Sequence, residues 1–195
     1  MTKPLGLLVT DASPLITLAA ADALECLSMP GVHVIIPDMV YFEVTRDLAR
    51  TGAEDIVRWA RRHAGQVEVV MTTIFTEFQV LQAADARVRS KGRGEQSALE
   101  ILNNEINSDP DLEAILLFED NDVRKRRFVQ ALPERVAALS TGDLLRELEA
   151  AGRIQSADQI LDAAAAHERN VTDQREQQSS GEARAMIRNL LTNQD

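Results

Sequence analysis

The chain has 195 residues, 45% of them hydrophobic and 27% charged, values that indicate one globular domain and exclude wholesale disorder. Its 31 acidic residues outnumber its 21 basic residues, and the formal net charge of −10 excludes a nucleic-acid binder that relies on a generally basic surface. If the protein acts on nucleic acid, a local basic patch must oppose the field of the whole chain.

Short apolar segments alternate with helical patterns along the chain. The strands we expect are Leu5–Thr10, Val32–Ile36, Val67–Met71, Ala114–Phe118 and Val136–Leu139. Ser13 and Pro14 are expected to cap and open the first helix, which would run to about Leu27. Further helices are expected over Pro37–Leu48, Ala53–His63, Thr73–Arg89, Glu95–Ile106, Val123–Val129, Asp143–Ala150 and from Ser156 onward. This alternation predicts βαβ units and an α/β fold with a mostly parallel sheet flanked by helices.

The character of the sequence changes after about residue 168. Residues 171–181 are rich in Gln and Ser and have no apolar period, which is typical of a linker. Glu182–Leu191 regains a short amphipathic pattern. We therefore expect one domain over residues 1–168, and a polar linker with a short amphipathic tail over 169–195 that adds little to the core.

Carboxylates are the only plentiful metal-ligating side chains. Cys26 is the single cysteine and the three histidines lie far apart in sequence, so neither a disulfide nor a Cys- or His-based zinc site is expected. Acidic ligands favour hard cations such as Mg²⁺ or Mn²⁺. The apolar stretch 5–24 contains two aspartates, so we expect no signal peptide, no membrane span, and a reducing cytoplasm as the compartment.

Four acidic residues stand beside the ends of buried segments. Asp11 ends the first expected strand and Asp120 follows the fourth, while Glu43 lies in the helix after the second strand and Glu95 opens a later helix. Each alone has an ordinary explanation, such as a helix cap for Asp11 or a favourable acid at a helix N-terminus for Glu95. Ligands of open parallel sheets bind beyond the carboxyl ends of the strands, so their common position predicts a site there.

The motifs around these acids resemble those of PIN domains. In chain order they are Asp11-Ala12-Ser13-Pro14-Leu15-Ile16, Pro37 to Glu43, Gly94-Glu95-Gln96-Ser97-Ala98, Leu116-Leu117-Phe118-Glu119-Asp120, and the closing segment Ser140 to Leu145. They are similar to the branch with a D-[TA]-S-P-L-I start, and many family members are VapC-type toxin ribonucleases. The resemblance covers about residues 5–166, and it implies a three-layer α/β/α nuclease domain within residues 1–168.

The resemblance implies hydrolysis of RNA phosphodiester bonds with one or two Mg²⁺ or Mn²⁺ ions. The catalytic and metal-binding residues would be Asp11, Glu43, Glu95 and Asp120, with Asp122 as the alternative to Asp120 because the last motif departs from the usual adjacent aspartates. Ser13 would support Asp11 by orienting it or a bound water. Toxins of this family usually pair with an antitoxin protein and often form homodimers, which are the partners we expect.

Basic residues gather near these motifs despite the acidic total. A phosphate-binding rim is expected from Arg93, Arg124, Lys125, Arg126 and Arg127. Two alternatives remain open: a catalytically inactive PIN-like binding or scaffold protein, and a Mg²⁺-dependent phosphoryl-transfer domain with Asp11 at the end of its first strand.

Overall fold

The computed structural model describes residues 5–119, 132–176, 179 and 181–192. Its centre is a five-stranded sheet in the order β3-β2-β1-β4-β5, with every neighbouring pair parallel. The strands are β1 (Leu5–Thr10), β2 (His33–Pro37), β3 (Val67–Val70), β4 (Glu113–Phe118) and β5 (Val136–Ser140). Since all strands run the same way, the segments that leave β1, β2, β4 and β5 emerge at one edge of the sheet.

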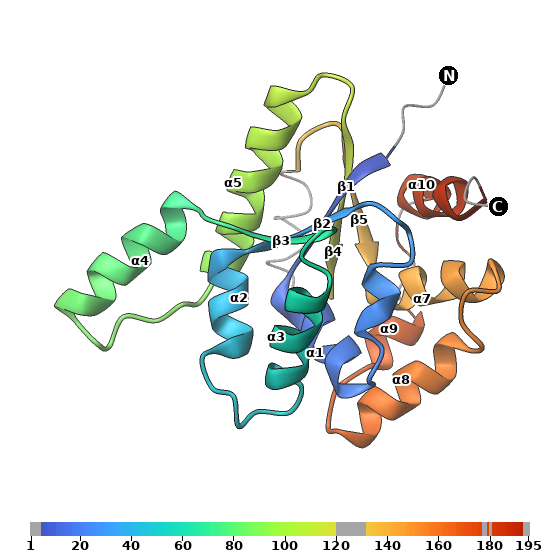
Figure 1. Ribbon diagram of the computed structural model, residues 1–195, viewed down its shortest axis with the longest axis horizontal. Helices are drawn as coiled ribbons and strands as arrows, with labels where there is room; N and C mark the ends of the chain where they lie inside the picture. The colour runs from blue at the N-terminus through green and yellow to red at the C-terminus, as the bar shows by residue number, and fades with distance from the viewer. Residues whose placement is uncertain (1–4, 120–131, 177–178, 180, 193–195) are drawn as a thin grey trace.

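Helices connect the strands and cover the sheet (Figure 1). Those in the first half are α1 (Ala12–Ala20), the 3₁₀ turn η1 (Leu24–Leu27), α2 (Asp38–Thr45), α3 (Ala53–Arg62), α4 (Thr73–Ala84) and α5 (Arg93–Ser108). The described helices in the second half are α7 (Thr141–Ala150), α8 (Ala157–Ala166), α9 (Thr172–Glu176) and α10 (Gly181–Thr192). Among the described residues, no helix has the length and apolarity that a bilayer crossing requires.

Alternate residues of the strands face opposite sides of the sheet, and both sides are buried. In β1, Leu8 packs into one core together with residues of α1, α3, α7, α8 and α10. Its neighbours Leu7 and Val9 belong to a second core formed with Ala98, Ile101, Leu102 and Ile106 of α5. The expected three-layer α/β/α arrangement around a parallel sheet is thus confirmed.

The first helix differs from its prediction at both ends. Asp11, rather than Ser13, occupies the N-cap position, and α1 begins at Ala12 with Pro14 in its first turn. The helix ends at Ala20 and does not continue to Leu27, because Asp22 adopts a left-handed conformation with φ of 53°. The N–H of Ala23 then donates to the Leu18 carbonyl at 2.8 Å, which closes the end of the helix.

The segment after α8 packs against the chain itself, although the sequence indicated a linker. Val171, Ala183, Ile187 and Leu191 are at most 6% exposed and join the same core as Leu8. The domain boundary at residue 168 stays a prediction. The described residues of 169–195 contact α7 and β5 and contribute to the core.

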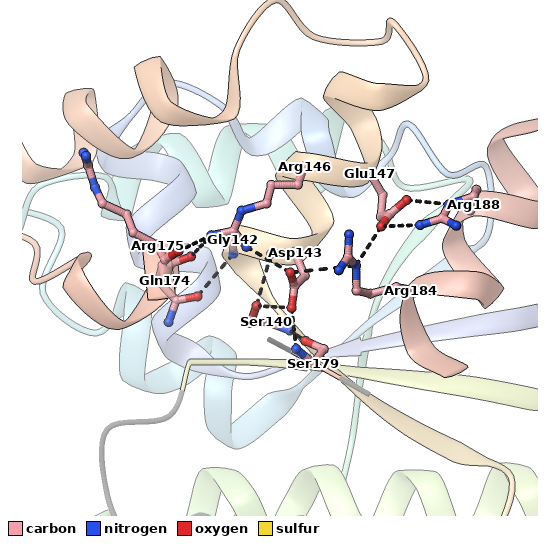
Figure 2. A network of polar contacts seen from close by, with 10 residues as sticks. All are labelled: Ser140, Gly142, Asp143, Arg146, Glu147, Gln174, Arg175, Ser179, Arg184 and Arg188. Carbon is pink, nitrogen blue, oxygen red and sulfur yellow. Dashed lines mark hydrogen bonds and ion pairs between the residues drawn. The ribbon is translucent and has the colours of Figure 1, made fainter. Parts of the chain in front are cut away.

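Two buried carboxylates of α7 bind this segment (Figure 2). Glu147 accepts from Arg184 Nε at 2.8 Å and from Arg188 Nε at 3.0 Å. Asp143 Oδ1 accepts from Arg146 Nη1 at 2.9 Å, and its Oδ2 accepts from the backbone N–H of Ser179. We name this set, Asp143, Glu147, Ser179, Arg184 and Arg188, the C-terminal clasp.

Candidate active site

Three of the four predicted acids are described, and each comes from a different element. Asp11 directly follows β1 and is 9% exposed, and its N–H donates to the Leu117 carbonyl of β4 at 3.0 Å. Glu43 lies in the second turn of α2, and Glu95 lies in the first turn of α5. The carboxyl edge of the sheet therefore carries Asp11, and two helices bring the other acids.

Gly94 shows how close two of these carboxylates are. A Cβ atom placed on Gly94 would lie 3.2 Å from Glu43 Oε2 and 3.7 Å from Asp11 Oδ1. Both carboxylates thus face the same point at the start of α5. Because Gly94 has no side chain, the backbone at the start of α5 can approach these two carboxylates. The next residue in the chain is the third acid, Glu95.

The three acids also act on one another electrostatically. Burial is the largest cause that raises the pKa of Glu43, and a hydrogen bond from Ser90 lowers it. The charges of Asp11 and Glu95 raise this pKa further, whereas Arg46 lowers it, and the balance is a raised pKa. Glu43 thus lies in the negative field of two other carboxylates, which is the field a cation would neutralise.

A fourth carboxylate, Glu119, directly follows β4, the strand that pairs with β1. It is 7% exposed, and its Oε2 accepts from Thr17 Oγ1 at 2.9 Å and from Arg169 Nη2 at 3.3 Å. Burial raises the pKa of Glu119 most strongly, whereas the nearby Thr141 hydroxyl, the hydrogen bond from Thr17 and the charge of Arg169 lower it. The charge of Asp11 raises this pKa further, and the net direction is upward.

Arg169 links the acid region to the segment after α8. Its Nε and Nη2 donate to Thr17 Oγ1 at 3.2 and 3.1 Å, and Nη2 also donates to the Ser13 carbonyl at 3.4 Å. The sequence pointed to neither Thr17 nor Arg169, since they are 152 positions apart and belong to no motif. In the sequence Glu119 is only part of the motif that ends at Asp120.

Of the other predicted site residues, the structure describes Ser13 and Arg93. Ser13 lies next to Asp11 in the first turn of α1, and the contact it shows is that of its carbonyl with Arg169. The guanidinium carbon of Arg93 lies 5.6 Å from the centre of the Phe78 ring, so this side chain is directed toward α4. The remaining candidates lie outside the described residues: Asp120, Asp122, Arg124, Lys125, Arg126 and Arg127.

A different acid at the same sheet edge has a structural role. Asp38 follows β2 and is 8% exposed. Its carboxylate accepts from the N–H of Met39 at 2.8 Å, and from the N–H and hydroxyl of Thr72 at 2.9 and 2.7 Å. These bonds tie α2 to the start of α4, and they occupy the oxygens that a ligand would need.

The described residues do not form a metal site by themselves. Within residues 5–119, 132–176, 179 and 181–192, no three His, Cys, Asp or Glu side chains are arranged closely enough to hold an ion. The chemistry of the acids nevertheless fits a hard divalent cation, because Asp11, Glu43 and Glu95 offer only carboxylate oxygens. Glu43 in particular experiences a repulsion from the other two that such a cation would relieve.

Comparison with known proteins identifies the domain. The profile of a family described as PIN domain matches residues 7–184, a range that includes α9 and most of the structure. No curated protein matches the chain. The match supports a nuclease-type domain, in agreement with the all-parallel sheet and the acids at its carboxyl edge. By this match the chain belongs to the PIN domain family.

Proposed function

We propose that the protein is a metal-dependent endoribonuclease that uses Asp11, Glu43, Glu95 and Asp120 to hold Mg²⁺ or Mn²⁺. One observation carries the proposal: Asp11 and Glu43 face the same glycine, Gly94, and Asp11 and Glu95 both raise the pKa of Glu43. Carboxylates from separate elements are costly to bring together in a partly buried site unless they bind something positive.

Each of the four acids would contribute carboxylate oxygens to the metal site. Asp11 and Glu43 would provide oxygens that both lie close to Gly94, and Glu95, the residue after Gly94, would add a third carboxylate. Asp120 completes the set, with Asp122 as the alternative. When bound, the divalent ion supplies Lewis acidity to the attacking water and to the phosphate oxygens.

Two features set the surroundings of this chemistry. Burial of Asp11 and Glu119 keeps the local dielectric low, which strengthens each electrostatic contact with a phosphate. Arg169 supplies a fixed positive charge beside Glu119, and its Nη2 also donates to the Ser13 carbonyl at 3.4 Å. The basic residues Arg93, Arg124, Lys125, Arg126 and Arg127 would contact the RNA backbone on either side.

The biological role we propose is that of the toxin in a toxin–antitoxin pair, acting on cellular RNA in the cytoplasm. This part rests on the D-[TA]-S-P-L-I start at Asp11 and on the order of the later motifs. An antitoxin protein would bind and restrain the enzyme, and a homodimer is the assembly we expect.

The test is cleavage of RNA by the purified full chain in Mn²⁺. Asp11→Asn removes a ligand charge without changing size, and we expect it to lower the cleavage rate by about 10²-fold or more, because metal catalysis supplies several kcal/mol. The matched control is Asp158→Asn, an exposed aspartate in the first turn of α8, which should cleave as wild type does.

The outcomes separate the alternatives. If wild type cleaves none of a varied set of RNAs in Mg²⁺ or Mn²⁺, the inactive binding or scaffold protein is the better description. If Asp11→Asn cleaves as fast as wild type, the acid cluster is not the active site.

A further inference from the structure

We propose that a pocket next to Glu43 binds one nucleotide of the RNA, with the nucleoside against its apolar wall and the phosphate against its arginines. This inference rests on the proposed ribonuclease function, and it names the part of the substrate that the enzyme recognises. The pocket has a volume of about 410 Å³. Pockets for small ligands typically measure about 300–1,000 Å³, so one nucleotide is of the right size.

The position of the pocket connects it to the acid cluster. Glu43 lines it, and so does Arg169, whose Nη2 donates to Glu119 Oε2 at 3.3 Å. A molecule in this pocket therefore contacts Glu43, one of the acids of the candidate active site. A phosphate attached to it would arrive beside the acids, where a scissile bond must lie.

The two kinds of wall match the two halves of a nucleotide. Ile16, Ala20, Val44 and Ile56 form an apolar side, against which the flat face of a base can lose its contact with water. Arg50, Arg169 and His167 also line the pocket. These side chains are typical of contacts to phosphate.

The charges that line the pocket favour an anionic ligand there over the rest of the protein surface. The whole chain has a net charge of −10, so its surface in general repels a phosphate. The pocket lining instead has two arginines and one acid, Glu43, and Arg169 also pairs with Glu119 at 3.3 Å. Arg50 now pairs with Asp47 at 3.5 Å, and both side chains are more than half exposed, so a phosphate can compete for this weak surface pair.

The test uses the full chain with a chelator present, so that no metal ion contributes. Adenosine 5′-monophosphate is titrated to millimolar concentration and followed by NMR at the backbone amides of residues 49–51, with adenosine and inorganic phosphate as separate arms. We expect the nucleotide to shift these amides and to bind more tightly than either half alone, because each half contacts a different wall.

Two pairs of variants locate the binding. Ala49→Trp fills the pocket from an exposed position, and Ala163→Trp places the same side chain on the exposed face of α8. Arg50→Glu reverses a pocket charge, and Arg58→Glu reverses a similarly exposed arginine, also paired three residues away, in α3. Both pocket variants should weaken nucleotide binding by about tenfold or more, whereas both controls should not.

Each result decides one point. Absence of binding, equal binding by Ala49→Trp and Ala163→Trp, or binding of phosphate alone as tightly as the nucleotide would overturn the nucleotide pocket. Nucleotide binding by a wild-type chain that cleaves no RNA would leave the pocket in place and remove the ribonuclease proposal. Tight binding of an unrelated protein at this face, with no nucleotide binding, would assign the pocket to a protein partner.

Discussion

Gly94 occupies a narrow space between two carboxylates, and its missing side chain is part of the site. An alanine there would put Cβ 3.2 Å from Glu43 Oε2 and 3.4 Å from Val40 Cγ2. The contact with Glu43 is tighter than ordinary van der Waals contact, so Glu43 must move by a few tenths of an ångström. Such a shift disturbs the acids while leaving the core intact.

We therefore expect Gly94→Ala to fold normally and to cleave RNA about ten- to a hundredfold more slowly, since small misplacements in an active site are costly. The measurement is the cleavage rate at saturating Mn²⁺, together with the melting temperature. Gly181→Ala is the matched control, because Gly181 also opens a helix but has no atom near its would-be Cβ. Equal rates for the two variants would mean that the position of Glu43 is unimportant.

The raised pKa of Glu43 predicts a pH dependence of stability. The folded protein holds the Glu43 proton more tightly than the unfolded chain does, so its contribution to stability falls as pH rises from about 4.3 through the raised pKa. In a chelator, Glu43→Gln should therefore melt at a higher temperature than wild type at neutral pH, and this advantage should vanish below about pH 4.

Thermal unfolding across this pH range, with Glu54→Gln of α3 as an exposed control, checks the prediction. Adding Mn²⁺ should reverse the order, because only wild type keeps the ligand. A Glu43→Gln variant that is less stable than wild type at neutral pH without metal would show that Glu43 is not repelled by its neighbours.

The acids themselves were accessible from the sequence, but their surroundings were not. Asp11, Glu43 and Glu95 each follow or accompany a recognisable apolar segment and a local motif. Arg169 contacts Thr17 and Glu119 only because α8 returns to α1, and no local pattern encodes that contact. Long-range partners of this kind depend on tertiary packing, which a single sequence does not display.

At the scale of elements, local signals predicted the strands better than the ends of helices. The predicted strand Leu5–Thr10 is the observed β1. A short apolar segment followed by turn residues is typical of a buried strand. The helix expected over Thr73–Arg89 ends at Ala84 instead. Asp85 accepts from the N–H of Arg87 at 2.9 Å, and this local turn competes with continuation of the helix.

The polar segment after α8 was the least predictable element. Gln174 is only 1% exposed, and its side-chain oxygen accepts from the N–H of Gly142 at the start of α7 at 3.2 Å. The backbone of α9 approaches Gly142 so closely that a Cβ there would clash with the Gln174 carbonyl. In the sequence, a polar residue such as Gln174, which is buried as a hydrogen-bond partner, looks the same as a polar residue of a linker.

The C-terminal clasp joins α10 to α7, and its contribution to the free energy of unfolding can be measured. Burial would raise the pKa of Glu147, but hydrogen bonds from Arg188 and Arg184 and their charges outweigh burial and lower it. Removing both arginines leaves a buried carboxylate without its cations. Arg184→Ala/Arg188→Ala should therefore lower the free energy of unfolding by about 3 kcal/mol or more at neutral pH.

Urea unfolding of the double variant and of Arg58→Ala, an exposed pair that should cost less than about 1 kcal/mol, provides the comparison. The stabilisation by Glu147 is present above its unfolded pKa of about 4.3 and is lost as pH falls through the lowered folded value. The gap between wild type and the double variant should thus narrow in acid. A double variant as stable as Arg58→Ala would mean that the clasp contributes nothing to folding.

At the scale of the whole molecule, the proposed function requires an acidic protein to bind an acidic polymer. With a net charge of −10, affinity for RNA has to come from a few local cations, and it should fall with salt according to how many phosphates they contact. Arg126 and Arg127 stay predicted members of that set. Reversing both to Glu should reduce the slope of log K against log salt by about 0.7 for each lost contact.

RNA binding of this variant, measured from low to high salt, tests the rim separately from the acids. Mn²⁺ affinity should stay as in wild type, because these arginines are not ligands. An unchanged salt slope would place Arg126 and Arg127 away from the RNA.

The most direct test of the central assignment is the binding of Mn²⁺ to the full chain, measured by calorimetry without RNA. Wild type and Asp158→Asn should bind Mn²⁺ alike, whereas Asp11→Asn and Glu43→Gln should each lose most of that binding, because Asp11 and Glu43 face the same point beside Gly94. Equal Mn²⁺ binding by wild type, Asp11→Asn and Glu43→Gln would contradict the account.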